Sequence, residues 1–334
     1  EPLLEKGLSM AHQQFELPHH YTPSTLTNAE GIKYKLQRTP SQIVLQGGNV
    51  RVAFDAQTGW MTQYVVDGTN FIGEQGALKP NFWRAVTDND MGFGAPQKMA
   101  VWHHPELKLE SITPGIVKGK DTKEGAIVMA SYDMPAVKAK LSLTYRLQKD
   151  GTIVVNMAMK TDPTAKVSDM LRFGMVLQMP YEMGNIQYFG RGPIENYSDR
   201  KQSERISIYS QTADNQFYPY IRPQETGSKQ DVQWWDQTNA NGVGLRFIPH
   251  AKSFGMSALH YAIDDLDEGL EKHQRHSYQV KKSPYTNVCI DYRQAGLGGT
   301  NSWGLLPLEP YRIHYGDMEY EFSMSPIHKL VAME

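Results

Sequence analysis

The sequence predicts an all-β fold, a large antiparallel β-sandwich with long functional loops. The clearest observation is the segment Ala139–Leu147, in which apolar and polar residues alternate strictly. Alternation with a period of two is typical of a strand with one buried face. Helical periodicity, by contrast, is confined to about Ile263–His273, which is too little helix to cover both faces of a parallel sheet.

Further strands and turns follow from the same pattern in chain order. Lys149–Gly151 supplies a hairpin turn, and the alternation resumes on the returning segment. Asp67 and Gly68 supply a second turn of this kind. The expected strands besides Ala139–Leu147 are Val50–Phe54, Trp60–Val66, Ile153–Met159 and Tyr320–Met324.

The amino-terminal residues predict a boundary. Gly7–Leu17 resembles one isolated strand, and Pro18–Asn28 is a connector rich in Pro, Ser and Thr. A lone strand is not stable by itself, so this one is either an edge strand of the main domain or the tail of a preceding domain. We therefore expect residues 1–29 to be a remnant strand with its linker and residues 30–334 to form one large domain. The start at Glu1, without a Met, suggests a piece of a longer protein.

Composition narrows the possible partners. The 334 residues contain 34 Lys and Arg against 36 Asp and Glu, a formal net charge of −2, and no long basic run. A nucleic-acid or membrane-surface partner would require a concentrated positive patch, so we expect neither. No segment approaches the roughly 18 uninterrupted apolar residues of a membrane helix. We expect a soluble protein, cytoplasmic or periplasmic, with the compartment left open.

The single cysteine, Cys289, excludes an internal disulfide and lies in an expected buried strand.

The segment Ala295–Gly304 has the most informative composition, with three glycines and short polar residues directly before Trp303. The glycines can take backbone angles closed to other residues, and the polar side chains, including Asn301, can hydrogen-bond within the turn. A loop of this kind is irregular yet fixed, and it presents the tryptophan. The flat indole suits stacking on the C–H face of a pyranose, while Asn and Thr reach its hydroxyls. The alternative is that Trp303 folds back as a plug over the core.

The segment Asn81–Gly94 places Arg84 and an Asp-Asn-Asp triplet ahead of two glycines, of which Gly92 is the first. An oxygen-rich triplet can bind a cation, but the Gly and the terminal Glu of an EF-hand loop are missing. The preferred interpretation is a pair of capped turns that are paired with Arg84. A position near a functional site is left open for the triplet, Asp88, Asn89 and Asp90.

Two further loops, 189–200 and 218–227, carry paired charges. The Gly-x-Gly of the first is not a nucleotide loop, because Pro193 follows at once and no Gly-Lys-Ser/Thr sequence or Rossmann pattern is present. Paired Arg and Glu residues in loops fix geometry more often than they catalyse. We expect a structural ion-pair network formed by Arg191, Glu195, Arg222 and Glu225.

Metal ligands are not assignable from the sequence. His273 and His276 have the i, i+3 spacing of shared ligation on a helix. A third ligand is not evident, so structural histidines are the preferred interpretation.

Four motifs, taken in order, resemble the carboxy-terminal small-chain domain of the large β-galactosidases of glycoside hydrolase family 2. The resemblance runs from about residue 30 to the end and is highly specific, because each motif is long and their order matches. Gly7–Leu17 resembles the last strand of the immunoglobulin-like domain that precedes this domain in the family. The resemblance implies an antiparallel super-sandwich related in fold to galactose mutarotases. The motifs are Phe82–Gly92, Gly190–Arg200, Tyr220–Gly227 and Gly296–Trp303.

The resemblance also implies what this chain lacks. The family's two catalytic carboxylates lie on an upstream (β/α)₈ barrel of about 250 residues, which the sequence does not supply. Retaining hydrolysis needs two carboxyl groups about 5–5.5 Å apart, and no pair here matches that role by motif. The chain is expected to be an accessory domain of a retaining β-galactosidase, inactive alone, whose partners are the parent's own barrel and immunoglobulin-like domains and a galactoside. A divalent cation, Mg or Ca, would belong to the parent's barrel and has no assignable ligand here.

The site residues carried over are few. Trp303 matches the family's tryptophan that projects into the barrel's substrate site, and residues 88–94 match a loop near that site. Val86 stands where the family usually has proline, and Thr300 with Asn301 replaces a more acidic pair seen in some members. The resemblance therefore implies a substrate-binding set of Trp303, Asn301, Asp88, Asn89, Asp90 and Gly92.

Two other classes of protein remain as alternatives. One is a free-standing aldose mutarotase or epimerase that uses a His and a Glu as acid and base. The other is an independent carbohydrate-binding module.

Overall fold

The computed structural model describes residues 4–16, 31–119, 122–267, 269–270, 275–301 and 303–328. The chain divides into two compact units, residues 1–30 and residues 31–334. In the first unit the expected strand Gly7–Leu17 is not formed, since its described residues 7–16 are irregular and exposed. A strand needs a hydrogen-bonded neighbour, and no ladder among the described residues includes this segment. Leu17 and the connector Pro18–Asn28 lie outside the described residues, and the origin of the segment in a preceding domain stays a prediction.

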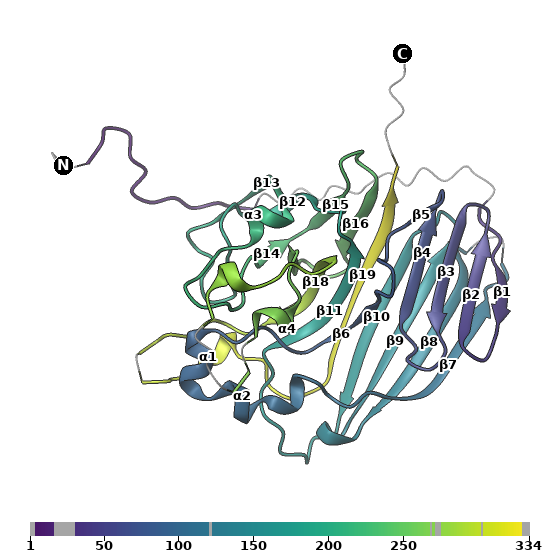
Figure 1. Cartoon of the computed structure of the whole chain (residues 1–334), viewed down its shortest axis with the longest axis horizontal. Helices are drawn as coiled ribbons and strands as arrows, with labels where there is room; N and C mark the ends of the chain where they lie inside the picture. The colour runs from purple at the N-terminus through teal and green to yellow at the C-terminus, as the bar shows by residue number, and fades with distance from the viewer. Residues whose placement is uncertain are drawn as a thin grey trace. The chain divides into compact units, whose positions relative to one another are not determined.

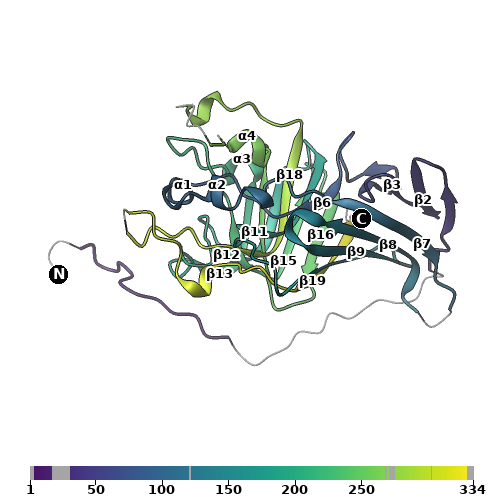
Figure 2. The same cartoon turned by 90° about the horizontal axis from the view of Figure 1, so that it is seen from below.

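The second unit is built from two antiparallel sheets (Figures 1 and 2), so the all-β prediction is confirmed. Sheet A contains ten described strands, in the order β1-β2-β3-β4-β6-β11-β18-β17-β14 with β5 beside β4. The strands of sheet A are β1 (Lys35–Arg38), β2 (Gln42–Gly47), β3 (Val50–Asp55), β4 (Met61–Val66), β5 (Thr69–Asn70), β6 (Leu78–Asn81), β11 (Arg172–Pro180), β14 (Lys229–Val232), β17 (Phe254–Leu259) and β18 (Tyr285–Gln294).

Sheet B contains nine described strands, in the order β13-β12-β15-β16-β19-β10-β9-β8-β7. The last described strand, β19, therefore lies in the middle of the sheet, between β16 and β10. The strands of sheet B are β7 (Lys108–Ile116), β8 (Glu124–Met134), β9 (Ala139–Gln148), β10 (Ile153–Thr161), β12 (Asn185–Gly192), β13 (Arg205–Thr212), β15 (Trp234–Thr238), β16 (Gly244–Pro249) and β19 (Met318–Ile327).

The hydrophobic core lies between the two sheets. In β9 the apolar positions of the alternating pattern are all buried, and the polar positions are half-buried or exposed. Phe54 of β3 contacts Tyr145 of β9, with ring centroids 4.9 Å apart. The ring centroids of Phe173 on β11 and Tyr320 on β19 are 6.0 Å apart. Each aromatic side chain of this kind buries about 150–250 Å², so these pairs hold sheet A against sheet B.

The strands expected from alternation are confirmed as β3, β4, β9, β10 and β19. Both expected turns are present, with positive φ at Gly151 in the turn Lys149–Gly151 and at Asp67 and Gly68 in the other. Cys289 lies on β18 and is 5% exposed, as its buried strand predicts.

The helices are short, and the helix expected over Ile263–His273 is wrong in length. The helix α4 covers only Ile263–Leu266, because Asp267 takes an extended conformation and Gly269 has a φ of 69°. Residues 271–274, with His273, lie outside the described residues. Among the described residues, no helix is long and apolar enough to cross a membrane. The other helices are α1 (Asp88–Phe93), α2 (Ala95–Lys98), η1 (Ala100–Trp102), η2 (Pro135–Val137), α3 (Ala213–Gln216), η3 (Ser277–Gln279) and η4 (Glu309–Tyr311).

Candidate functional site

The four motifs meet at one end of the second unit. We call the described residues of 82–94, 190–200, 218–227 and 295–304 the loop cluster. Hydrogen bonds join each of these segments to at least one of the others. Helix α1 and the loop that follows residue 294, coloured yellow, lie side by side in both views (Figures 1 and 2). Chain segments far apart in sequence are therefore brought to one surface.

The acidic triplet opens a short helix, α1, rather than an irregular loop. The Thr87 hydroxyl accepts a hydrogen bond from the backbone N–H of Asp90 (3.1 Å), and the Asp90 carboxylate accepts one from the backbone N–H of Thr87 (2.9 Å). This capping box satisfies two backbone donors that would otherwise lack partners. The helix ends at Gly94, which has a φ of 80°. The expected side-chain capping is thus present, although in a helix.

Arg84 anchors α1 to the start of residues 295–304, which we call the tryptophan loop. Its guanidinium binds the Asp90 carboxylate through two hydrogen bonds (2.7 and 3.0 Å), and both side chains are fully buried. The same guanidinium donates to the carbonyls of Ala295 (2.5 Å) and Gly296 (3.0 Å). Since arginine presents its donors in a rigid fork, one side chain fixes both segments. Asp90 belongs to this buried anchor, and its carboxylate does not face solvent.

The tryptophan loop is held at its base and exposed at its tip. The Asp199 carboxylate accepts hydrogen bonds from the backbone N–H groups of Leu297 (2.9 Å) and Gly298 (2.8 Å). Gly298 adopts the expected left-handed conformation, with a φ of 72°. Asn301 Oδ1 accepts from the backbone N–H of Trp303 (2.9 Å), and Trp303 is 91% exposed. The structure therefore places the indole in solvent rather than over the core.

Helix α1 and the tryptophan loop also touch directly. Asn89 Nδ2 donates to the carbonyl of Leu297 (3.1 Å). Gly304 has a φ of 76°, and a Cβ atom on it would collide with the backbone of Gly92. The solvent-facing side of the loop cluster includes the exposed residues Asp88, Asn89, Gly92, Asn301 and Trp303.

The four charged residues of the middle motifs do not form one network, which corrects the prediction. Arg191 pairs with Asp231 of β14 and donates to the carbonyl of Glu204 (2.9 Å). Glu225 pairs with Arg172 of β11 (3.0 Å), which is also 3.2 Å from a carboxylate oxygen of Asp291 on β18. Both loop residues thus find partners on regular strands, whose positions are fixed by the sheet.

Glu195 and Arg222 tie the loops of the cluster together. Glu195 accepts hydrogen bonds from Tyr220, from the Thr226 hydroxyl (2.9 Å) and from the backbone N–H of Gly227 (2.8 Å). Burial raises the pKa of the Glu195 carboxyl, but these hydrogen bonds outweigh burial and leave the pKa below its ordinary value. Arg222 pairs with Asp88 at the start of α1 (2.8 Å). Glu195 is therefore an ionised anchor rather than a proton donor.

The triplet does not present a cation site in this arrangement. Arg222 pairs with the Asp88 carboxylate, and Arg84 pairs with that of Asp90.

Of the two histidines with ligand spacing, His276 is exposed, and its Nδ1 atom lies 3.2 Å from the carbonyl oxygen of Ile221. Its expected partner His273 lies outside the described residues.

Sequence reasoning missed several residues that hold the cluster together. Asp199 lies within the second motif, so its position there was a usable signal. Arg172, Asp231 and Asp291 lie on strands without any motif, and nothing in their local sequence marks them as ion-pair partners. Only the sheet pairing places Arg172 beside Asp291.

The second unit is an antiparallel sandwich that presents an exposed tryptophan from an anchored loop, and the comparisons assign it to one family. The family model described as "Beta galactosidase small chain" matches residues 46–325. The chain therefore belongs to the β-galactosidase small-chain family.

The relatives that match include two proteins named "Beta-galactosidase". That of Priestia megaterium is 27% identical over 327 residues, which cover 96% of this chain and 30% of the relative. That of Lactobacillus delbrueckii subsp. bulgaricus is 28% identical over 309 residues, which cover 88% of this chain and 29% of the relative. The chain thus spans about 30% of the length of these relatives.

Solved structures with a similar course of chain have low sequence identity. The galactose 1-epimerase of Lactobacillus acidophilus has a TM-score of 0.46 at 11% identity, covering 88% of this chain and 98% of that one. A GH36 α-galactosidase of Geobacillus stearothermophilus has a TM-score of 0.43 at 8% identity, covering 86% of this chain and 41% of that one.

Proposed function

We propose that this chain is the carboxy-terminal accessory domain of a retaining β-galactosidase and lends Trp303 to a substrate site on the parent's catalytic barrel. The carrying observation is the 91% exposure of Trp303 at the tip of a loop whose base is fixed by Arg84 and Asp199. Membership of the small-chain family and the names of the relatives support this proposal. Terminal β-galactosyl groups, as in lactose, are the proposed substrate class.

The loop supports this role because its anchors fix the backbone at its base before any ligand binds. A pre-organised side chain loses less conformational entropy on binding than a mobile one. The indole offers a flat apolar face for a sugar ring, and the backbone hydrogen bond from Trp303 to Asn301 fixes the turn beside it. We propose Asp88, Asn89 and Gly92 as neighbouring contacts, because they share this exposed surface with Trp303. Asp90 acts by holding the loop in place.

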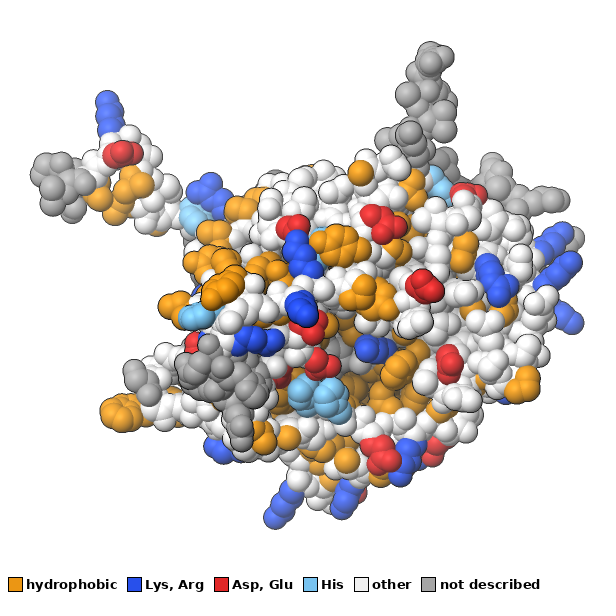
Figure 3. Space-filling model, in the orientation of Figure 1, with side chains coloured by type: hydrophobic (Ala, Val, Ile, Leu, Met, Phe, Trp, Pro, Cys, Tyr) orange, Lys and Arg blue, Asp and Glu red, His pale blue; other side chains and the backbone are white. Residues whose placement is uncertain are grey.

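Exposed apolar side chains near the cluster support a partner domain. Tyr218 is 59% exposed, Ile221 85% and Tyr278 84%. The ring of His276 contacts two of these residues: it stacks on Tyr278 and is hydrogen-bonded to the carbonyl of Ile221. Exposed apolar surface of this kind marks interaction sites, and hydrophobic side chains gather on this side of the unit (Figure 3). We propose that the parent's barrel and immunoglobulin-like domains cover it.

The chemistry of hydrolysis would come from outside this chain. Asp88, Asp90, Glu195 and Asp199 are all engaged in the anchors described above. For the same reason the loop cluster does not offer a free carboxylate set to a divalent cation, and we assign any such ion to the parent's barrel.

The test is Trp303→Ala in the β-galactosidase that contains this chain, with Trp303→Phe as the matched control. Losing the indole contact should lower kcat/KM for lactose by about 10- to 150-fold, the equivalent of roughly 1.5–3 kcal/mol for a buried large side chain. Phe retains a flat ring and should restore part of the loss. The melting temperature should stay unchanged in both variants, because the indole is exposed in this chain. Unchanged kinetics with a clearly lower melting temperature would contradict the proposal.

A further inference from the structure

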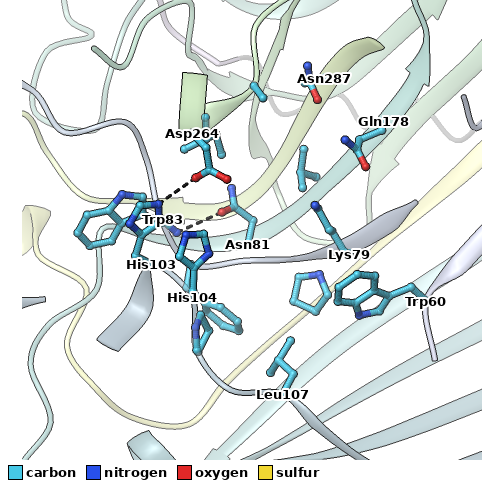
Figure 4. Close-up of a pocket in the computed structure, with 16 residues that line it drawn as sticks. Trp60, Lys79, Asn81, Trp83, His103, His104, Leu107, Gln178, Asp264 and Asn287 are labelled. Carbon is cyan, nitrogen blue, oxygen red and sulfur yellow. Dashed lines mark hydrogen bonds and ion pairs between the residues drawn. The ribbon is translucent and has the colours of Figure 1, made fainter. Parts of the chain in front are cut away.

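A pocket lies on the outer face of sheet A, and Phe82 and Trp83 of the loop cluster are among the residues that line it. Its cavity volume is about 250 Å³. The hollow visible in Figure 3 has hydrophobic, basic, acidic and histidine surfaces at its walls. The residues that matter for its chemistry are Trp60, Lys79, Asn81, Gln178, Asp264 and Asn287 (Figure 4).

The register of three adjacent strands places the polar residues together. Lys79 of β6 pairs with Val176 of β11, and Gln178 of β11 pairs with Asn287 of β18. Directly paired residues of antiparallel strands share one face of the sheet. The alternate residues Met175 and Leu177 are buried in the sandwich core. The polar set therefore faces outward as a consequence of the sheet itself.

Three residues that line this pocket carry buried donor atoms without hydrogen-bond partners among the described residues. Asn81 and Asn287 are only 8% and 6% exposed, yet within the described part of the chain neither Nδ2 atom has a hydrogen-bond partner. The indole Nε1 atom of Trp60 is also buried and also lacks a hydrogen-bond partner among the described residues. A buried donor left unsatisfied costs about 1–3 kcal/mol, and native proteins retain few of them. Three such donors on residues around one pocket would be satisfied by a ligand with several oxygen acceptors once their side chains turn toward the cavity.

The charges of the pocket favour a neutral ligand. Lys79 supplies one positive charge, and its ammonium lies 5.9 Å from the centre of the Trp60 ring. Asp264 supplies one negative charge, and its carboxylate lies 2.9 Å from Nε2 of His103. This contact and Lys79 keep the pKa of Asp264 below its ordinary value, although burial opposes them. With one charge of each sign, the pocket does not select strongly for an anion or a cation.

A metal ion fits the geometry less well. His103, His104 and Asp264 bring ligating atoms within 4.8 Å of one another. The rings of His103 and His104, however, are stacked with centroids 4.0 Å apart and planes 20° apart. Ring nitrogens direct their lone pairs within the ring plane, so two nearly parallel rings do not converge on one ion as tetrahedral ligation requires.

We propose that this pocket binds the ring of one neutral pyranose sugar. Amide groups and an indole N–H suit the hydroxyls of a sugar, and an aromatic wall suits its C–H face. The volume is below the range of about 300–1,000 Å³ typical of drug-sized ligands, which fits a monosaccharide unit. The proposal does not rest on the role of Trp303, because none of the residues that line the pocket belongs to the tryptophan loop.

The test is calorimetric titration of the chain with galactose and with glucose, comparing wild type, Asn287→Leu and Ile208→Ala, a control at an exposed position on β13 outside the pocket. At least one sugar should bind the wild type saturably. Asn287→Leu should weaken that binding about tenfold, because it removes the donor and keeps a similar volume. Ile208→Ala should leave it unchanged. No saturable binding of either sugar, or binding that is the same in wild type and Asn287→Leu, would overturn the proposal.

Folding of the variant is checked by its melting temperature. Replacing an unsatisfied buried donor by an apolar group of the same shape is nearly neutral or stabilising, so Asn287→Leu should melt no lower than wild type without sugar. If Asn287→Leu does not fold, Gln178→Ala provides the second measurement, since Gln178 is only half-buried. Sugar binding that is unaffected by the Gln178 change would then count against the pocket.

Discussion

Lys229 is a lysine held almost entirely out of solvent beside the loop cluster. It is 1% exposed, and its ammonium donates a hydrogen bond to the carbonyl of Gly227 (3.0 Å). Burial lowers the pKa of Lys229 to about 8, although Glu195 and Glu204 oppose the shift. The folded protein therefore carries the cost of a buried charge at neutral pH.

The pH dependence of stability follows from this lysine. Between pH 8 and pH 10.5 the unfolded chain holds a proton on Lys229 that the folded chain has released, so the free energy of unfolding rises with pH in this window. Below about pH 8 the gain is lost. Lys229→Met should be more stable than wild type at pH 7, by up to about 3 kcal/mol, and the difference should shrink toward pH 10. Urea unfolding of both proteins at several pH values measures it, and a difference independent of pH would show that the lysine does not titrate in this way.

At the scale of single residues, the sequence identifies the segments of the loop cluster better than the ion pairs that join them. Asp90 and Arg84 were expected to pair, because they lie close together in one motif. The partners of Arg191 and Glu225 were not found, because Asp231 and Arg172 lie on other strands. Ion-pair partners are selected by three-dimensional proximity, which a single motif does not contain.

At the scale of elements, the contact between α1 and the tryptophan loop depends on two opposed glycines. Gly304 needs a left-handed backbone and has no room for a Cβ atom, whereas a Cβ atom on Gly92 would meet its nearest neighbour, Gly304, at an ordinary 3.6 Å. The two positions therefore form a matched pair across one contact.

Gly304→Ala should destabilise the chain by roughly 1–3 kcal/mol, because it combines backbone strain with a collision. Gly92→Ala should be neutral or stabilising by up to about 1 kcal/mol, because alanine favours a helix interior. Denaturant unfolding of both variants compares them directly. In the parent enzyme, Gly304→Ala should also lower kcat/KM by moving the tryptophan. Equal stabilities for the two variants would indicate that the loop does not rest on α1.

The elements predicted correctly are those with one buried face. Alternation identified β9, whose outer residues are all polar, and β10, whose core-facing residues are apolar at every second position. It could not identify β11, whose residues are buried on both faces over most of its length. Nor could it identify α1, a helix of six residues that depends on the Thr87 cap rather than on apolar periodicity. Short capped elements and doubly buried strands carry too little periodic signal.

At the scale of the whole molecule, we expect a cooperative β-rich unit without β-galactosidase activity of its own. The two sheets share one core, and the carboxylates of the loop cluster are engaged in anchors. The purified chain should unfold in one transition and leave a nitrophenyl β-galactoside intact. Turnover that survived rigorous purification and disappeared on mutation of a carboxylate in this chain would refute this expectation.

The central position of β19 in sheet B has a consequence for synthesis on the ribosome. Residues 318–327 are translated after every other described strand, yet they join β16 to β10. Until they emerge, those two strands are open edges, and open edges promote pairing with other chains. A nascent chain stalled before residue 318 should therefore aggregate rather than accumulate as a partial sandwich, and chaperone capture during translation should end when this strand is added.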